Sequence, residues 1–420
     1  MVQQYDLIVV GAGMVGATLA RAMADSPLRV ALLDAMPLDR PLEARPTPSG
    51  YDPRVSALSA ASENILTRLG AWERIAPDCR SPYRYMCVWD GAGTGEIRFD
   101  AGMVGENRLG HIIENWRVQQ ALLDSLNTTD VSLLGGRQVE QLVQEADGWA
   151  LQLADGERLQ APLIVAADGA RSRLRELAGF AMREWDYLHH AVVTTVQTER
   201  PHAETAWQSF LDAGPLAFLP LQDRDGRHYC SIVWSLVPEE ARRVMALDEA
   251  TFAAEIEAAI EGRLGRILQV DARHCIPLRQ RHARRYAQPG LVLIGDAAHS
   301  IHPLAGQGVN LGLLDAAELA AVLQAALTRG EAFTSLPVLQ RYERRRMGAN
   351  LSMMLAMEGF ERLFHADTLA LRWVRNTGMR WMDGLQGLKA GIVRRALGLE
   401  GELPPLARPV IEEEKVRLPG

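Results

Sequence analysis

Lysine is almost missing from this chain of 420 residues. It occurs only as Lys389 and Lys415, so that nearly all of the 45 basic side chains are arginines. The formal net charge is −7. Nucleic-acid binding would need a basic stripe over an element that reads a groove, and the sequence suggests neither. We therefore expect no nucleic-acid partner.

Cysteine is also sparse. Cys79, Cys87, Cys230 and Cys275 are scattered and form no CxxC pair, which argues against a dithiol redox centre and against a zinc site. The histidines supply no matching set of ligands, so we predict no metal centre. Cysteine usage of this kind fits a reducing, cytoplasmic compartment.

Long apolar runs are the third feature that the sequence lacks. None approaches the roughly 18 residues that span a bilayer. The N-terminus has neither the basic start nor the small-residue cleavage site of a signal peptide. The hydrophobic fraction of 48% and the charged fraction of 23% are those of a globular protein. A chain of this length has room for two or three domains.

A glycine-rich motif follows the first buried strand. Gly11, Gly13 and Gly16 lead into a helical run, and a second strand pattern ends at Asp34. The spacing from Gly16 to Asp34 is close to the ~20 residues expected between such glycines and the acid that binds a ribose hydroxyl. The motif predicts a dinucleotide site without choosing between NAD and FAD. A tight packing turn without a ligand is the alternative.

The rest of the chain is organised around GDAAHSIHPLAGQGVNLG, which runs from Gly295 to Gly312. It lies between an apolar run, which predicts a buried strand, and an alanine- and leucine-rich segment, which predicts a helix. Asp296 stands at the strand end, where it can hold hydroxyl groups, and the amides after Gly306 face a helix N-terminus that favours negative charge. The stretch predicts a site for an anionic or strongly polar ligand. An ordinary strand-to-helix loop is the alternative.

A further polar strand end lies in the middle of the chain, where Asp168 and Gly169 follow the apolar run 163–166. In a chain with a single GxGxxG motif, this suggests one nucleotide site assembled from several segments. Asp-Gly is also a common plain turn, which is the alternative.

Arg54 lies at the start of a segment whose apolar residues, from Val55 to Leu69, keep helical spacing. We predict a helix there, ended by Gly70. An arginine beside a helix N-terminus is electrostatically unfavourable. Arg54 therefore either meets a ligand or a carboxylate, or is an ordinary surface residue.

The block after Gly179 is rich in β-branched and aromatic residues and predicts a second domain that contributes a sheet. It includes a predicted helix at 249–260 and a predicted strand around 270–277. A long helix is predicted at 341–364. The tail after Gly401 is expected to be extended and loosely held.

Taken together, these motifs resemble those of the single-component aromatic flavoprotein monooxygenases. Within that group, the strings RVSALSAASENILTRLGAW, HIIEN, AFLPL, SIVWSL and DAAHSIHPLAGQGVNLG are similar to those of the ubiquinone-biosynthesis FAD-dependent hydroxylases of bacteria and mitochondria. The resemblance covers essentially the whole chain. It implies an α/β fold: an FAD-binding Rossmann-like domain of the GR2 type, as in p-hydroxybenzoate hydroxylase, with an inserted mixed β-sheet substrate domain and C-terminal helices.

The domains that the resemblance implies are discontinuous. They are an FAD-binding domain (1–85, 100–180 and 286–345), a substrate domain (86–99 and 181–285), a C-terminal helical region (346–400) and a tail (401–420).

The same resemblance assigns FAD-binding roles by position but identifies no catalytic residue. The implied residues are Gly11, Gly13, Gly16 and Asp34 for the ADP half, Arg54 near the flavin, Asp168 in a region shared with NADPH, Gly295 and Asp296 around the ribityl chain, and Gly306, Gln307, Gly308, Val309 and Asn310 for negative charge on the reduced ring. The family usually has Glu where this chain has the shorter Asp34.

The resemblance implies an aromatic hydroxylase that uses NADPH or NADH and O2 to hydroxylate a polyprenylated phenol or quinol. WDYLHH, YCSIVWSLVPEEA and YRYMCVWD favour the first ring hydroxylation, that of 2-polyprenylphenol. WQSFLDAGPLAFLPL and QPGLVLIGDAAH are also similar to the branch that hydroxylates a later methoxyphenol or demethoxy-quinol intermediate, which is the alternative. We expect the first ring hydroxylation.

Three other classes compete with this interpretation. A flavin halogenase would need an active-site lysine and a WxWxIP stretch, and a disulfide reductase would need a redox cysteine pair; the sequence has none of these. The motifs leave open a non-catalytic flavoprotein scaffold of a biosynthetic complex.

Basic and apolar residues alternate at steps of three or four between Leu371 and Leu399, with Trp373 and Trp381 among them. An amphipathic stretch of this kind can lie on an acidic membrane surface. Covering the flavin domain or an oligomer interface is the alternative. The expected location is the cytoplasm, with peripheral contact at the inner membrane face left open, as are other ubiquinone-biosynthesis proteins and a second copy of the chain as partners.

Overall fold

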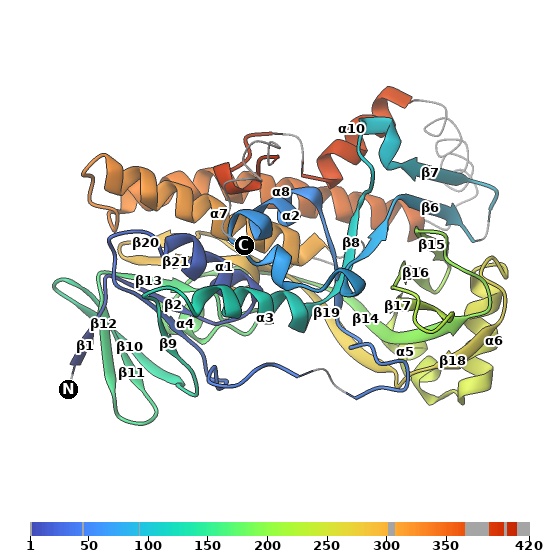
Figure 1. The fold of residues 1–420 in the computed structure, drawn as a ribbon, viewed down its shortest axis with the longest axis horizontal. Coiled ribbons are helices and arrows are strands. Elements are labelled where there is room, and N and C mark those ends of the chain that lie inside the picture. The colour runs from blue at the N-terminus through green and yellow to red at the C-terminus, as the bar shows by residue number, and fades with distance from the viewer. Residues whose placement is uncertain are drawn as a thin grey trace.

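The computed structural model describes residues 2–43, 46–91, 93–300, 307–365, 386–398 and 401–409. Two large sheets with helices against them occupy the two ends of the molecule, and the long helices α7 (Gln307–Thr328) and α8 (Leu336–His365) run along the top of the view in Figure 1. The α/β fold class expected from the sequence is confirmed.

The first sheet has six strands, five of them parallel. In spatial order they are β20 (Ala287–Gln288), β21 (Leu291–Leu293), β13 (Leu163–Ala166), β2 (Leu7–Val10), β3 (Val30–Leu33) and β9 (Ser132–Leu134). Every residue of β2, β3, β13 and β21 is buried, because parallel strands of this kind are covered on both faces. Helix α1 (Met14–Met23) contacts both α7 and α3 (Asn115–Leu126).

Helix α7 contradicts our expectation that no apolar run approaches the length of a membrane span. By length and hydropathy Gly308–Thr328 would suffice, but 72% of that window is buried inside the protein. Asp315 and Glu318 interrupt the run in the sequence, and in the fold they pair with arginines of α8. The helix is apolar all round because it lies in the core.

Smaller sheets and short helices surround the first sheet. The four-stranded sheet is β1 (Val2–Gln4), β12 (Arg158–Ala161), β11 (Gly148–Leu153) and β10 (Val139–Glu145), and the three-stranded sheet is β4 (Val55–Leu58), β8 (Gly110–Glu114) and β5 (Ser81–Tyr83). The short helices are α2 (Ala60–Arg68), η1 (Trp72–Arg74), η2 (Pro77–Cys79), α4 (Arg173–Leu177), η4 (Gly295–Ala297) and η5 (Pro405–Ala407).

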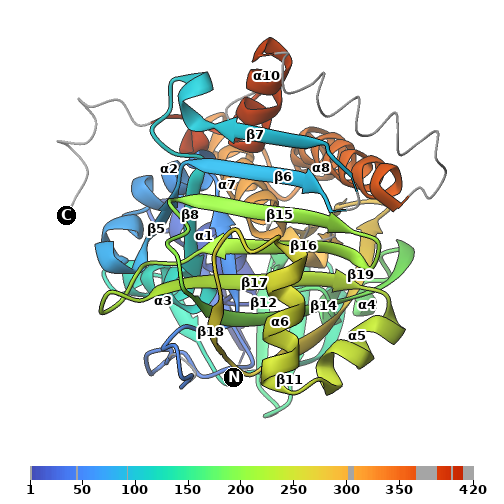
Figure 2. The ribbon, with the colours of Figure 1, turned by 90° about the vertical axis from the view of Figure 1, so that its right-hand side faces the viewer.

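The second large sheet is mixed and has nine strands. In spatial order they are β22 (His299–Ser300), β19 (His274–Ala283), β14 (Met182–Thr198), β17 (His228–Leu236), β16 (Gly214–Pro220), β15 (Thr205–Leu211), β6 (Tyr85–Asp90) and β7 (Glu96–Asp100), with β18 (Ile267–Val270) paired to β14 off this path. The pair β15–β6 is parallel and the others are antiparallel. Figure 2 shows α5 (Pro238–Ala246) and α6 (Glu249–Ala259) in front of its outer face.

Alternation along the strands divides this sheet into two faces. On β14, Val192 and Val196 pack under α5 and α6 with the other residues of the outer core, whereas Ala191 and Val193 line a cavity on the inner face. The helix α10 (Gln386–Ala396) and η3 (Ala101–Val104) lie beside β6 and β7 at the upper right of Figure 1.

Three sequence predictions were wrong in detail. Residues 55–58 form the strand β4, because they pair with β8, and the helix begins only after Ser59, whose hydroxyl caps it. The single strand expected around 270–277 is the junction of β18 and β19, and α5 was missed. The tail is held at η5, where Ala407 is fully buried and accepts a hydrogen bond from Asn64 at 3.2 Å.

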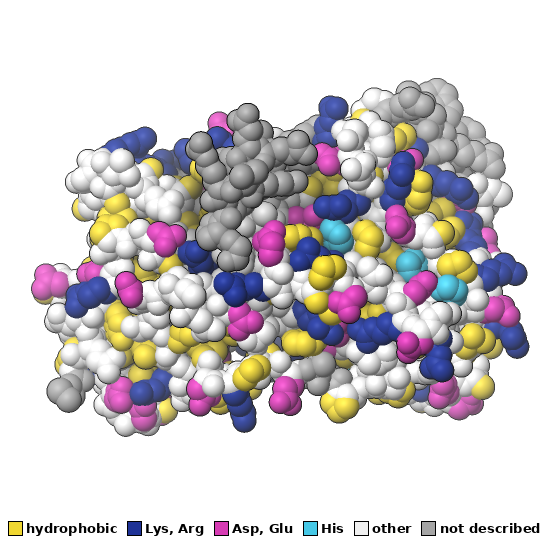
Figure 3. Space-filling model, viewed as in Figure 1, with side chains coloured by type: hydrophobic (Ala, Val, Ile, Leu, Met, Phe, Trp, Pro, Cys, Tyr) yellow, Lys and Arg dark blue, Asp and Glu magenta, His cyan; other side chains and the backbone are white. Residues whose placement is uncertain are grey.

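The domain boundaries stay a prediction. Helix α8 runs continuously across residues 345 and 346, where the sequence places a boundary, and β22 joins the large mixed sheet from within the segment 286–345. Residues 366–385, which contain most of the amphipathic stretch, lie outside the described part of the chain. On the face shown in Figure 3, acidic and basic side chains are interspersed with apolar ones.

Candidate functional site

The predicted site residues lie at the carboxyl ends of the parallel strands. Gly11 follows β2, Asp34 follows β3, Asp168 follows β13, and Gly295 and Asp296 follow β21. Since β2, β3, β13 and β21 are neighbours in one parallel sheet, these four ends share one edge. That edge is where open α/β sheets bind their ligands.

Two of the three motif glycines are required by packing. Gly11 has φ +106°, and a Cβ there would lie 2.3 Å from the carbonyl oxygen of Ala167. A Cβ on Gly16 would lie 1.8 Å from the carbonyl oxygen of Gly11. Any larger residue would push the start of α1 away from the strands.

Gly13 has a different reason to be glycine. Its φ is −64°, which any residue adopts, and a Cβ there would meet nothing within 4 Å. It is also the N-cap of α1 and provides no side-chain hydrogen bond to the helix. The open space therefore lies against the free amides of a helix N-terminus, which is where a pyrophosphate binds.

Asp34 reaches back to the glycine loop. One carboxylate oxygen accepts from the amide of Ala12 at 2.6 Å and the other accepts from the amide of Met36 at 2.7 Å. Each oxygen keeps further acceptor capacity. The side chain of Asp34 is therefore long enough to reach the glycine loop, and it can also accept a hydrogen bond from a ribose hydroxyl group.

Only one of the two carboxylate oxygens of Asp168 has a hydrogen-bond partner among the described residues. One oxygen accepts from the amide of Leu174 at 3.2 Å, while the buried Oδ1 has no hydrogen-bond partner among the described residues. Burial raises the pKa of this carboxyl group. A buried oxygen without a partner is unusual and is expected to meet a ligand or to carry a proton.

Asp296 projects from η4 into the cavity, so its side chain is exposed there although protein surrounds it. Burial, and next the charge of Asp315, raise its pKa, while His299 lowers it. Gly295 has φ +57°, and a Cβ there would press on Val15 of α1 at 3.1 Å. The close packing of α1 on this turn fixes where Asp296 points.

The first turn of α7 carries the remaining predicted residues. Gln307 opens the helix, and Gly308, Val309 and Asn310 follow; Gly306 lies outside the described residues. The Asn310 side chain is hydrogen-bonded within the protein. It accepts from the amide of Ser59 at 3.0 Å and donates to the carbonyl of Ala57 at 2.8 Å. Only the backbone of Asn310 is therefore available to a ligand.

Arg54 stands before β4, not at a helix N-terminus. Glu114 accepts from the amide of Asp52 at 2.8 Å, and Asp52 accepts from the amide of Arg54 at 2.8 Å. The guanidinium group is 60% exposed and lines the same cavity as Asp296. The buried Glu114 thus fixes the backbone from which Arg54 extends.

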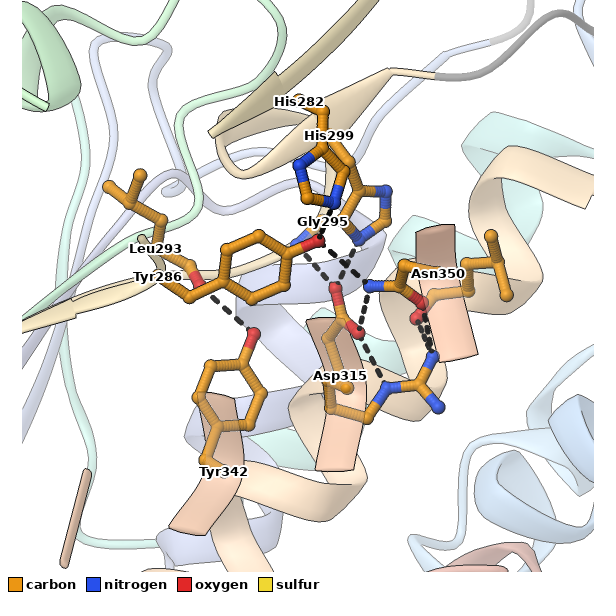
Figure 4. Close-up of polar contacts among 10 residues, drawn as sticks. His282, Tyr286, Leu293, Gly295, His299, Asp315, Tyr342 and Asn350 are labelled. Atoms are coloured by element: carbon orange, nitrogen blue, oxygen red, sulfur yellow. Dashed lines mark hydrogen bonds and ion pairs between the residues drawn. The ribbon is translucent and has the colours of Figure 1, made fainter. Parts of the chain in front are cut away.

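A buried network below Asp296 was not predicted. Asp315 of α7 is fully buried and accepts from His299 at 2.5 Å, from the amide of Gly295 at 3.1 Å, from Arg346 at 2.7 Å and from Asn350 at 3.1 Å (Figure 4). Burial alone would raise the pKa of Asp315, but His299 and Arg346 bring it well below its usual value.

The network continues to Tyr286, which shares a hydrogen bond of 3.0 Å with His282 (Figure 4). Burial, together with the charge of His299, lowers the pKa of His282 to about 4. The available signal for the network was a charged residue inside an apolar helix, since a buried carboxylate requires partners. The partners themselves come from β22 and α8, and no local motif reveals them.

The cavity has a volume of about 940 Å³. Its polar lining includes Arg54, Arg171, Arg279, Arg281 and Asp296, and the apolar lining comes from the inner face of the mixed sheet. Space at the glycine loop, an orphaned oxygen on Asp168 and a cavity that joins Asp296 to Arg54 all fit a bound FAD. When bound, FAD accepts a hydride and activates O2; the protein positions the ring and supplies charge.

Comparisons with known proteins identify the family. A family model described as an FAD binding domain matches residues 4–354. The chain is 38% identical over 402 residues to the 3-demethoxyubiquinol 3-hydroxylase of Escherichia coli, covering 94% of this chain and 99% of that protein. It is 34% identical over 409 residues to the ubiquinone hydroxylase UbiL of Rhodospirillum rubrum, covering 96% of this chain and 93% of that protein.

Solved structures agree on the fold. A probable FAD-dependent monooxygenase of Pseudomonas aeruginosa, PqsL, superposes with a TM-score of 0.72 at 21% identity, over 90% of this chain and 99% of that chain. The cofactor is FAD, and the chain is an FAD-dependent monooxygenase of the kind that uses NAD(P)H and O2. This chain belongs to the ubiquinone-biosynthesis FAD-dependent hydroxylase family, within the class A aromatic flavoprotein monooxygenases.

Proposed function

We propose that this protein hydroxylates the ring of a polyprenylated phenol or quinol in ubiquinone biosynthesis. The observation that supports the proposal is the cavity of about 940 Å³ in which Arg54 and Asp296 share one volume with apolar side chains of the mixed sheet. Such a cavity brings a flavin and an apolar ring together and keeps water away from both.

The substrate that we favour is a demethoxyubiquinol, hydroxylated late in the pathway. The relative of Escherichia coli is named for that reaction, and its match to this chain extends over nearly the whole of both proteins. The first ring hydroxylation, that of 2-polyprenylphenol, which is the step expected from the sequence, is the second candidate. It is supported by the strings WDYLHH, YCSIVWSLVPEEA and YRYMCVWD.

The acidic, amide and basic groups around the cavity would each have a separate role. Asp296 would accept from the ribityl hydroxyl groups, and the amides of Gly308, Val309 and Asn310 would hold negative charge on the reduced ring. Arg54 and Arg279 line the cavity as cations. Cations beside a bound phenol lower its pKa, and the phenolate that results has a more nucleophilic ring.

Peripheral contact with the inner membrane face is part of the proposal, because an isoprenoid substrate resides in the membrane. The segment 366–385, on which the expectation rests most, lies outside the described residues. Contacts with other proteins of the pathway and with a second copy of the chain are likewise proposals.

The test is turnover by the purified yellow protein. NADPH oxidation and O2 uptake are followed with a short-chain demethoxyubiquinol, with the matching 2-prenylphenol, and without either. We expect stimulation by the demethoxyubiquinol and a product heavier by one oxygen atom, located on the ring by fragmentation. Preference for the 2-prenylphenol would move the assignment to the first hydroxylation, and turnover of neither would refute the proposal. A variant that we expect to bind FAD more weakly, Gly13→Leu, is the control.

A further inference from the structure

The two sides of the cavity differ in polarity, and the order of the strands fixes which side is which. β19 and β22 supply Arg279, Arg281 and Ser300 together with apolar residues of β19, whereas β6 and β7 supply only the apolar Met86 and Phe99. β14, β17, β16 and β15 lie between them, so five inter-strand steps separate β19 from β6. At about 4.8 Å a step, this is a distance of about 24 Å along the sheet. The cavity is therefore elongated, with a charged side and an apolar side.

Helix α10 closes the apolar side. Lys389 and Val393 are four residues apart and lie on one face of the helix, Leu397 follows its last residue and donates its amide to the carbonyl of Val393 at 2.9 Å, and all three are buried. Val393 and Leu397 line the cavity and pack with Ala101 and Leu109. Met86 and Phe99 pack against the same cluster from the mixed sheet, and Tyr83 packs against it from β5.

The position of α10 is fixed at its C-terminal end. The carbonyl of Leu397 accepts from the amide of Ala61 at 3.2 Å, and a Cβ on Gly398 would lie 2.8 Å from the Cβ of Ala61. Ala61 belongs to α2, which Asn310 ties to the first turn of α7 through Ser59 and Ser62. The helix that closes the apolar side is thus anchored to the element that begins at the proposed flavin site.

We propose that the apolar side, lined by Tyr83, Met86, Phe99, Leu109, Val393 and Leu397, is the binding site for the isoprenoid chain of the substrate. The ring lies on the side of Asp296, and the chain crosses the sheet towards α10. An amphiphile with one polar ring and one linear hydrocarbon chain matches a cavity that changes from charged to apolar along its length. The inference rests on the proposed function, because it takes the substrate to be prenylated.

The experiment compares two substrates that share one ring and differ in chain length, one isoprene unit against several. Equilibrium binding to the FAD-loaded protein is measured from the change in flavin absorbance, and KM is measured by turnover. We expect the wild type to prefer the longer chain. Val393→Trp should reduce that preference about tenfold, which corresponds to about 1.4 kcal/mol, because the indole fills the space beneath α10.

Arg394→Trp is the matched control. Arg394 is exposed on the same helix, one residue further on, so the same side chain is introduced outside the cavity. It should leave the chain-length preference unchanged. Val393→Thr keeps the shape of the side chain and adds a hydroxyl group, and it is the second variant if Val393→Trp fails to fold. It should also reduce the preference for the longer chain.

The outcomes separate the two proposals. Equal effects of Val393→Trp on both chain lengths, or an equal effect of Arg394→Trp, would overturn the isoprenoid site while leaving ring hydroxylation intact. Turnover of neither substrate by the wild type would refute the proposed function. The binding measurement would then still decide the isoprenoid site, because a chain-length preference that Val393→Trp removes requires the site, and no preference excludes it.

Discussion

Two parts of the cavity, which we call the floor and the wall, are stabilised by different kinds of interaction. The floor, beneath Asp296, is a network of buried charges in which Asp315 contacts His299, Arg346 and Asn350. The wall is the inner face of the mixed sheet, where small and apolar side chains such as Ala217 predominate. In the floor each group depends on its partners, and in the wall each side chain contributes mainly its own volume.

This difference shows which interactions fix the geometry of the site and which mainly fill volume. A buried ion pair contributes little net stability, but removing one partner leaves the other uncompensated. A network of this kind therefore fixes geometry, here the turn from which Asp296 projects. Apolar packing tolerates exchange as long as volume is conserved. The floor should thus determine how FAD is held, and the wall should determine which substrate fits.

The largest expected effect comes from breaking the floor. Asp315→Asn removes the charge that compensates Arg346 and His299, and we expect a loss of about 3–5 kcal/mol in unfolding free energy, measured by urea denaturation. Glu318→Gln is the control, because Glu318 lies one turn further along α7 and, although it is buried, its partner Arg345 is 55% exposed and stays hydrated when the carboxylate is lost. That pair should be worth at most about 1 kcal/mol. Equal losses in the two variants would mean that the fully buried network does not differ from a pair with one exposed partner.

The second effect concerns the glycine loop at the edge of the floor. Gly13→Leu should leave the apo-protein folded, since nothing lies within 4 Å of the added Cβ. It should weaken FAD binding by about 5- to 150-fold, equivalent to about 1–3 kcal/mol of overpacking. Gly16→Ala is expected to do the reverse and destabilise the fold itself, because its Cβ would lie 1.8 Å from a backbone oxygen. Flavin content and melting temperature, measured together, separate the two. Full flavin retention in Gly13→Leu would remove the cofactor from this space.

The third effect is a pH dependence of the stability, which arises from His282 of the buried network. The pKa of His282 is about 4 in the folded protein, below the usual value of 6.5. Between these values the unfolded chain binds a proton that the folded protein does not, so the stability is complete above pH 6.5 and decreases as the pH falls towards 4. The slope from this residue is at most about 1.4 kcal/mol per pH unit.

His282→Asn should flatten that slope when urea midpoints are compared across the interval. His228→Asn is the control, because His228 is partly exposed on the mixed sheet and pairs with Asp223. If His282→Asn keeps the wild-type slope, the acid sensitivity of the protein arises outside the network.

Sequence analysis predicted the strand ends that carry the site better than it predicted the buried network of the floor or the arrangement of the wall. The apolar runs that form β2, β13 and β21 were identifiable because parallel strands are buried on both faces. The polar residues that follow them were then placed on one edge by the topology of such sheets. Asp315 was missed, since its partners Arg346 and Asn350 come from a different helix and leave no local motif.

The sheet that forms the wall was predicted, but the order of its strands was not, because that order depends on pairings between distant parts of the chain. The parallel pairing of Cys87 with Trp207 joins β6 to β15 across more than a hundred residues. Helix α10 closes the cavity from still further along the sequence. Residues 55–58 fit helical spacing, but pairing with β8 made them a strand. Tertiary contacts override local propensity in such segments.

The smallest expected effect concerns a single polar group of the wall. Gln208 lines the cavity from β15, and its cross-strand neighbour is Ala217 of β16. An amide beside the small and apolar side chains of this face can hydrogen-bond a ring oxygen of the substrate, and one such bond is worth about 0.5–1.5 kcal/mol. Gln208→Leu should therefore raise KM about 2- to 10-fold with stability unchanged or higher, whereas Gln197→Leu, on β14 and outside the cavity lining, should leave KM unchanged. An unchanged KM in Gln208→Leu would mean that the wall recognises the ring by shape alone, and the contrast between a polar floor and an apolar wall would then be complete.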